Sequence, residues 1–319
     1  MKVGLGFLGG PELRSLAEVG RAAERAGFDS LWHAETRITR DSVTALTTLA
    51  MSTKKVRLGS AAINVFTRGA VLTAITWAAL AEAAPGRILL GVGPGSPDPL
   101  GQQGYTFDFP VSRLREFVAA VRATWDKPPP VSYDGRFSSL AGLVPEVRPP
   151  APVPIYLCVT GPRALDCAGE VADGVILNAF MPVSYTRRAL ARLDVAAGGT
   201  FHGEVGQCMV VALADTVPEA AARVRPILAT YLVYFPNLAA ETGLDPEFLT
   251  RLREQAREGG LESTFTELPD SLVSEHSLVG PVDACRERLV AYRDAGLQLP
   301  VLYPDPLSID RTIRELASA

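Results

Sequence analysis

The sequence predicts an α/β protein folded as a (β/α)₈ barrel of the TIM type, with insertions. Strand and helix signals alternate along nearly the whole length of 319 residues. Hydrophobic residues make up 47% of the chain, which is enough for a large core. Alternation repeated this often in a chain of this length favours a closed barrel. An open, doubly wound parallel sheet is the alternative.

The individual elements follow from short apolar runs and from helix boundary signals. Gly27 is expected to close the first helix, and Asp41 to cap the second. The predicted strands span residues 2–8, 30–33, 56–63, 87–92, 155–159, 174–178, 207–213 and 299–303. The predicted helices span residues 12–26, 41–53, 69–84, 112–125, 162–171, 183–197 and 282–295, with others opening at Pro218 and near the C-terminal end.

Two segments interrupt this alternation, and we expect residues 1–319 to form one barrel domain that contains both. Residues 127–153 are rich in proline, and Tyr133-Asp134-Gly135-Arg136 is a hairpin signature, so this stretch predicts an inserted flap. Residues 231–275 are polar and predict a helical insertion.

Composition excludes several classes of function. A net charge of −4 without a basic run argues against nucleic acid or an anionic membrane as partner. The longest apolar stretch, residues 70–84, is too short to span a bilayer. Neither a metal-binding spacing nor a nucleophile motif is present in the sequence, so we expect no metal site. The four cysteines have no paired spacing, which favours reduced thiols and a cytoplasmic location.

Ligands of parallel α/β folds bind at the carboxyl ends of the strands. Residues 61–64 and 93–96 therefore form the predicted rim of an active site. The glycine loop at 91–96 is not a dinucleotide fingerprint, because Ser96-Pro97-Asp98-Pro99 is expected to block a helix directly after it. The loop is either a tight turn or a place where backbone approaches a flat ligand.

Thr160-Gly161-Pro162-Arg163 directly follows another predicted strand. Pro162 suits the first helical turn, and Thr160 or Gly161 would cap it. Free backbone N–H groups beside the Arg163 guanidinium would make an anion site. The alternative is an ordinary capped helix with a solvent-facing arginine.

Polar residues also follow the second and third strands. Glu35 is the only carboxylate of residues 32–37, and it could exchange a proton with a substrate if burial raised its pKa. His33 either contacts a ligand or is packed outside the barrel. Asn64 is either a ligand contact or an ordinary loop residue.

Taken together and in this order, these segments resemble the bacterial luciferase-like family. The resemblance rests on AGFDSLWHAE, VRLGSAAINVFTR, GRILLGVGPG and PVPIYLCVTGPRALDCAGEVADGVILNA. Within the family they are similar to the F420-dependent branch that includes methylenetetrahydromethanopterin reductase. The resemblance implies a TIM-like barrel that binds coenzyme F420 or, in other branches, FMN, with hydride transfer at the central ring.

The resemblance also assigns site residues. It implies a non-proline cis peptide between Ala61 and Ala62 that supports the cofactor ring. Many relatives have an acid–histidine pair at the end of the second strand, and here Thr36 stands in the place of the histidine. Some F420-dependent enzymes carry a glutamate at the position of Ser96, and methanopterin reductases carry one at that of Gly6. We expect the substrate to contact His33, Thr36 and Ser96. The remaining expected cofactor contacts are Asn64, Gly93, Pro94, Gly95, Thr160, Gly161, Pro162, Arg163 and Asn178.

The sequence therefore predicts an F420-dependent oxidoreductase. Hydride would pass between reduced deazaflavin and a C=N or polarised C=C bond of a small organic substrate, with Glu35 polarising or protonating that substrate. One alternative is an FMN-dependent two-component monooxygenase, and another is a ligand-binding barrel without catalysis. The resemblance further implies a homodimer formed by helices near the second and third strands.

Overall fold

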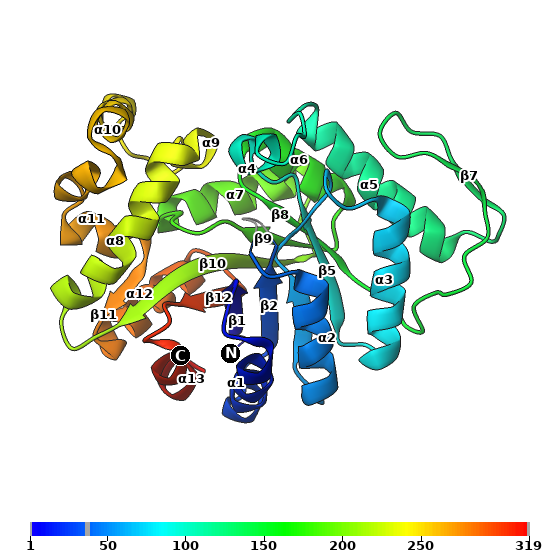
Figure 1. Cartoon of the computed structure of the whole chain (residues 1–319), viewed down its shortest axis with the longest axis horizontal. Coiled ribbons are helices and arrows are strands. Elements are labelled where there is room, and N and C mark those ends of the chain that lie inside the picture. The colour runs from blue at the N-terminus through cyan, green and yellow to red at the C-terminus, as the bar shows by residue number, and fades with distance from the viewer. Residues whose placement is uncertain (1, 36–38, 318–319) are drawn as a thin grey trace.

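A computed structural model describes residues 2–35 and 39–317, and within them eight parallel strands close into a barrel (Figure 1). The pairing of β9 with β10 completes the ring, so the predicted closed barrel is confirmed and the open sheet is wrong. In ring order the strands are β1 (Gly4–Leu8), β2 (Ser30–Ala34), β3 (Arg57–Ser60), β5 (Ile88–Gly93), β8 (Ile155–Val159), β9 (Gly174–Leu177), β10 (Glu204–Leu213) and β12 (Leu299–Pro304).

Two further strands belong to the same sheet. The predicted strand at 56–63 is broken, since β3 ends at Ser60 and β4 (Ile63–Asn64) continues the pairing with β5. The peptide bond between Ala61 and Ala62, inside the break, is cis. β11 (Leu278–Gly280) was not predicted; it pairs with the last three residues of β10, beyond the stretch of β10 that pairs with β9.

Helices connect the strands and cover the barrel. Gly27 ends α1 in the left-handed conformation at φ 95°, and the Asp41 carboxylate accepts the Thr44 N–H at 2.7 Å at the start of α2, so both predicted caps are confirmed. The helices are α1 (Leu13–Ala26), α2 (Ser42–Ser52), α3 (Ala70–Ala83), α4 (Pro97–Gly101), α5 (Pro110–Asp126), α6 (Pro162–Val171), α7 (Val183–Ala196), α8 (Val217–Tyr234), α12 (Val282–Asp294) and α13 (Ile309–Leu316). Within the described ranges no helix combines the length and apolarity needed to cross a bilayer.

Helix α4 overturns one expectation. Ser96-Pro97-Asp98-Pro99 does not block a helix, because α4 begins at Pro97. Proline is tolerated at this first position, since the N–H that it lacks would have no partner within the helix. The dinucleotide-binding fold is nevertheless excluded, because the sheet is a closed barrel.

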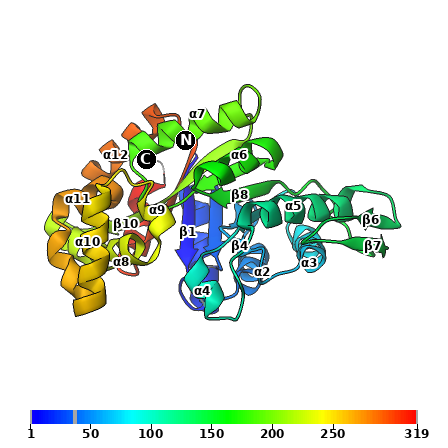
Figure 2. The same cartoon turned by 90° about the horizontal axis from the view of Figure 1, so that it is seen from above.

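The two interrupting segments are folded and lie on opposite sides of the barrel (Figure 2). One contains an antiparallel hairpin of β6 (Val131–Tyr133) and β7 (Leu140–Leu143). The other extends from the end of α8 and contains α9 (Pro236–Ala239), α10 (Pro246–Gly259), a 3₁₀ helix (Leu261–Glu267) and α11 (Asp270–His276).

Large and small residues alternate inside the barrel, as is usual in small barrels. Three aromatic side chains each fill the space above a glycine on a neighbouring strand. A Cβ atom added at any of these glycines would lie only 2.3–2.4 Å from a ring atom. The pairs are Trp32 with Gly59, Tyr156 with Gly174, and Tyr303 with Gly6.

Charged groups close the amino-terminal end of the barrel. The Arg57 guanidinium donates to Asp29 at 2.9 Å and to Glu204 at 2.9 Å. Glu204 also accepts from the Lys2 ammonium at 2.6 Å and from the Tyr156 hydroxyl at 3.0 Å. Burial opposes ionisation of Glu204, but these partners outweigh it and lower the pKa of the carboxyl below its ordinary value.

Candidate active site

The opposite, carboxyl end of the barrel brings the predicted cofactor residues together. Asn64 pairs with Gly93 between β4 and β5, and β5 in turn pairs with β8. Since Val159 of β8 pairs with Leu177 of β9, the residues that follow them, Thr160 and Asn178, leave adjacent strands. The residues assigned to the cofactor therefore lie on consecutive strand ends.

The glycine loop is shaped by contacts within the protein. A Cβ atom at Gly91 would lie 1.7 Å from the Ser60 carbonyl oxygen, and one at Gly95 would lie 2.0 Å from the Asn64 amide nitrogen. The Ser60 hydroxyl donates to the Gly91 carbonyl at 2.7 Å and accepts the Gly91 N–H at 3.0 Å. The glycines thus allow the chain after β3 to lie directly against β5, and they fix where Ala61 and Ala62 emerge.

We call the opening at the carboxyl end of the barrel the mouth, and an uncharged surface lies at its bottom. Ala61, Cys158, Cys208 and Tyr303 pack on the closed interior of the barrel, yet each remains partly exposed. The interior layer beneath them is closed: Trp32, Leu299 and Val301 are fully buried. We call these four residues the barrel floor, because each is partly exposed whereas the interior residues packed against them are buried.

Helix α6 begins beside this floor. Gly161, not Thr160, is its N-cap, and no side chain of the described residues caps its first turn. Thr160 is buried, and its carbonyl oxygen accepts a hydrogen bond from the Tyr185 hydroxyl. Arg163 is exposed and forms no ion pair with a described residue. The uncapped N–H groups and this cation are suited to an anion.

Each of the two asparagines at the mouth uses its side-chain oxygen in a hydrogen bond to a nearby backbone N–H. The Asn64 side-chain oxygen accepts the Phe66 N–H at 2.8 Å, and that of Asn178 accepts the Ala179 N–H at 2.8 Å. Ser96, just after the glycine loop, is half-buried, and its side chain does not cap α4. These groups remain suited to a polar ligand.

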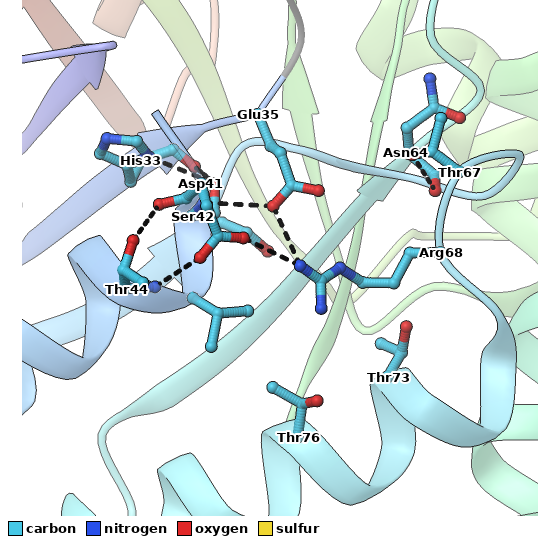
Figure 3. Close-up of polar contacts among 12 residues, drawn as sticks. His33, Glu35, Asp41, Ser42, Thr44, Asn64, Thr67, Arg68, Thr73 and Thr76 are labelled. Carbon is cyan, nitrogen blue, oxygen red and sulfur yellow. Dashed lines mark hydrogen bonds and ion pairs between the residues drawn. The ribbon is translucent and has the colours of Figure 1, made fainter. Parts of the chain in front are cut away.

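Glu35 belongs to a network at the rim (Figure 3). One carboxylate oxygen accepts the Ser42 N–H at 3.1 Å and lies 3.5 Å from the Arg68 guanidinium, which also binds Asp41 at 2.9 Å. Burial raises the pKa of Glu35 above its ordinary value, although Arg68 and the Ser42 N–H oppose the shift. The Glu35 N–H donates to the Ala62 carbonyl at 3.2 Å, so this acid is attached to the chain beside the floor.

His33 lies on the outer side of β2. Trp32 fills the barrel interior, whereas His33 is fully buried against the start of α2, with Nδ1 3.2 Å from the Ser42 hydroxyl oxygen (Figure 3). His33 is therefore packed outside the barrel, the second of the two positions considered from the sequence. We leave this residue out of the substrate site proposed below. Thr36 lies outside the described residues.

Burial of His33 predicts a loss of stability in acid. Desolvation lowers the pKa of His33 to about 4 from 6.5 in an exposed histidine. The unfolded chain therefore takes up a proton near pH 6.5 that the folded chain accepts only near pH 4. Stability should fall through this window, by about 3 kcal/mol in total for this group.

Urea unfolding between pH 7 and 4 checks this expectation. His33→Gln should flatten the pH dependence of the free energy of unfolding, while His202→Gln, at an exposed position, should leave it unchanged. An equal slope for His33→Gln and wild type would contradict a neutral buried imidazole.

The sequence did not predict several residues that lie at the mouth. Tyr303 shares the strand parity of Leu299 and Val301, which was a usable signal for an inward position. The pairing of Arg68 with Glu35 had no local signal. No cluster of three or more metal-ligating side chains occurs in the part of the chain that the structure describes.

The chain is similar to two named proteins over nearly its full length. A 5,10-methylenetetrahydromethanopterin reductase of Methanolobus tindarius is 28% identical over 307 residues, covering 93% of this chain and 92% of that protein. A putative coenzyme F420-dependent oxidoreductase of Mycobacterium tuberculosis is 28% identical over 336 residues, covering 95% and 94%.

Solved structures share the fold. The coenzyme F420-dependent tetrahydromethanopterin reductase of Methanopyrus kandleri superposes with a TM-score of 0.85 at 21% identity, covering 100% of this chain and 98% of that one. The FMN-bound oxygenating constituent of 3,6-diketocamphane monooxygenase from Pseudomonas putida gives 0.71 at 17% identity, covering 99% and 96%. The sequence model of the luciferase-like monooxygenases matches residues 3–299. This chain belongs to the luciferase-like monooxygenase family.

Proposed function

We propose that this protein is an F420-dependent oxidoreductase that acts on a C=N or polarised C=C bond of a small organic substrate. The observation that carries the proposal is the mouth of the barrel. Its uncharged floor is bordered by consecutive strand ends that bear Asn64, Gly93, Thr160 and Asn178. The full-length similarity to a putative coenzyme F420-dependent oxidoreductase supports this choice of cofactor.

The residues present fit such a cofactor. A flat, uncharged ring suits a floor made of Ala61, Cys158, Cys208 and Tyr303, which carries no charge. The uncapped start of α6 and the exposed Arg163 would hold the phosphate of the cofactor side chain. When bound, reduced F420 supplies a hydride from its central ring. The protein's contribution is to hold the substrate against that ring and to exclude water.

We propose Glu35 as the group that polarises or protonates the substrate. Its second carboxylate oxygen makes no hydrogen bond to a described residue, and its raised pKa keeps more of the acid protonated near neutral pH. Glu35→Gln should lower kcat by about 100-fold while leaving the Kd of F420 nearly unchanged. In wild type, activity should decline as the pH rises through the pKa of Glu35, and the variant should lack this inflection.

Asp41→Asn is the matched control, because Asp41 also binds Arg68 but lies farther along the chain, at the α2 cap. Both variants are assayed by F420 fluorescence titration and by oxidation of reduced F420 with imine and enone substrates. An equal loss of F420 affinity and turnover in Glu35→Gln would reject the proton-transfer role.

The first test of the proposed function is the titration of the purified protein with F420 and, in parallel, with FMN. Micromolar binding of F420 alone supports the proposal. Preference for FMN supports the second candidate, a two-component monooxygenase, which the similarity to the FMN-bound Pseudomonas putida enzyme favours. Binding of neither leaves a ligand-binding barrel without this chemistry.

We further propose that the protein is a homodimer formed through α2 and α3. Met51 on α2 and Leu72 and Ile75 on α3 are 75%, 58% and 39% exposed, although all three are apolar. Helix α2 contains no charged residue, and Glu82 is the only one in α3. An exposed apolar surface of this kind is suited to a second copy of the chain.

Placing charge on this surface should dissociate the dimer. We expect Leu72→Arg/Ile75→Arg to elute as a monomer in size-exclusion chromatography with light scattering, where wild type is a dimer. Val195→Arg is the control, because Val195 is 80% exposed on α7, outside this surface. A double variant that remains dimeric would place the interface elsewhere.

The state of the cysteines supports a proposal for the cellular location of the protein. Cys158, Cys167, Cys208 and Cys285 are all free, which agrees with a reducing compartment. We therefore propose a cytoplasmic location, in line with the cofactor. Fractionation of cells that produce the protein tests this assignment.

A further inference from the structure

The three aromatic–glycine pairs inside the barrel differ in how their polar groups are satisfied. The Trp32 indole N–H donates to the Ser30 hydroxyl at 2.8 Å, and the Tyr156 hydroxyl donates to Glu204 at 3.0 Å. The Tyr303 hydroxyl is equally buried, but it makes no hydrogen bond of normal geometry with any described residue. Only the pair at the mouth therefore has an unsatisfied polar group.

The partner that the barrel offers the Tyr303 hydroxyl is a weak one. The Cys208 thiol lies within its reach, with the Cys158 thiol and the Tyr231 side chain nearby, and thiols are weak hydrogen-bond acceptors. A buried hydroxyl without a partner costs folding free energy, so such a group in a folded protein calls for an explanation. The Tyr303 side chain is partly exposed and belongs to the floor, so a small rotation that uncovers the hydroxyl would let a molecule bound at the mouth supply the partner.

We propose that the Tyr303 hydroxyl donates a hydrogen bond to a carbonyl oxygen or ring nitrogen of the cofactor ring that covers the floor. The inference rests on the proposed function, which places that ring over Ala61, another floor residue. Gly6 has a steric part in this arrangement, because any side chain there would collide with the Tyr303 ring. Tyr303 is thus a positioning residue held in place by β1.

The chemistry of the phenol favours an uncharged acceptor. Burial raises the pKa of Tyr303 well above its ordinary value, and the nearby Cys208 adds to this shift, so the hydroxyl stays protonated at neutral pH. A protonated phenol is a hydrogen-bond donor without charge. It aligns a neutral carbonyl or ring nitrogen, whereas a carboxylate at the same place would favour a cation.

The test compares Tyr303→Phe with wild type and with Tyr156→Phe. Both variants lose one hydroxyl and keep the ring above its glycine, but the Tyr156 hydroxyl is bound by Glu204 at the closed end. For each protein we would measure the Kd of F420 by fluorescence, the absorption maximum of bound F420, and the Tm without ligand. FMN replaces F420 as the titrant if wild type binds only FMN.

We expect Tyr303→Phe to bind F420 about 10-fold more weakly, with a shifted absorption maximum and a ligand-free Tm that is not lowered. Tyr156→Phe should have a lowered Tm and the wild-type Kd. An unchanged Kd and spectrum in Tyr303→Phe would overturn the inference and leave the proposed function standing. A lowered ligand-free Tm in Tyr303→Phe would also overturn it, because the hydroxyl would then have a partner within the protein. If wild type binds neither F420 nor FMN, the proposed function itself fails, and this inference with it.

Discussion

Gly91→Ala is expected to destabilise the barrel by about 3 kcal/mol or more and to abolish the F420 binding proposed above. The new Cβ atom would lie 1.7 Å from the Ser60 carbonyl oxygen, which is a backbone atom and cannot rotate away. Relief requires β3 to move away from β5, and this movement breaks both hydrogen bonds of the Ser60 hydroxyl to Gly91. Ala61 follows directly in the chain, so the floor moves with β3.

Urea unfolding and F420 titration of the purified variant check both parts of this prediction. Gly101→Ala is the control, because a Cβ atom at Gly101, in α4, meets nothing within 4 Å. That substitution should keep or slightly raise stability, since alanine is favoured over glycine in a helix. Wild-type stability in Gly91→Ala would show that β3 and β5 can separate at no cost.

Arg57→Met is expected to cost about 3 kcal/mol of stability at neutral pH without changing the affinity for F420. The substitution leaves Asp29 and Glu204 without their shared cation, and the Glu204 carboxylate is mostly buried. The cluster closes the amino-terminal end of the barrel, so the mouth at the other end keeps its geometry. Stability and cofactor binding should therefore respond separately to this change.

The same ion cluster predicts a pH dependence. The pKa of Glu204 is lowered in the folded protein, so its contribution to stability is present above the unfolded pKa near 4.5 and is lost as the pH falls through the folded value. Urea unfolding of wild type should show this loss, and Arg57→Met should show less of it. Arg122→Met, which breaks a half-exposed pair with Asp173, should change stability little. A small effect of Arg57→Met at neutral pH would mean that Lys2 alone suffices for Glu204.

Most of the fold could be predicted because its signals are local. The strand Ile155–Val159 and the helix Pro162–Val171 were predicted with their observed bounds, since an apolar run and a proline at a helix start mark them in the sequence. Barrel closure followed from the number of such units. Local signals also placed glycines and polar residues at the ends of predicted strands, and in the structure those strands are consecutive.

The parts that could not be predicted depend on contacts between distant segments. The family resemblance implied the cis peptide between Ala61 and Ala62, which the structure confirms, but no local pattern in the sequence marks the break after Ser60. At this point the Ser60 hydroxyl is bonded to Gly91, and at the rim Glu35 is joined to Arg68, both across long stretches of sequence. Nothing near Tyr303 in the sequence indicates that its ring lies over Gly6. These contacts shape the mouth and set its charge. Their residues are far apart in the sequence and meet only in the closed barrel, so no local pattern indicates them.

The contact between Tyr303 and Gly6 also constrains how this barrel can change during evolution. The two residues stand near opposite ends of the gene, yet the closed ring makes β1 and β12 neighbours. A mutation that adds a side chain at position 6 first meets the tyrosine ring, so it is disfavoured until position 303 has become smaller. A carboxylate at position 6, in the first strand, would therefore compete with the Tyr303 ring for the same space. The residue at position 303 thus limits which side chains the first strand can carry into the barrel.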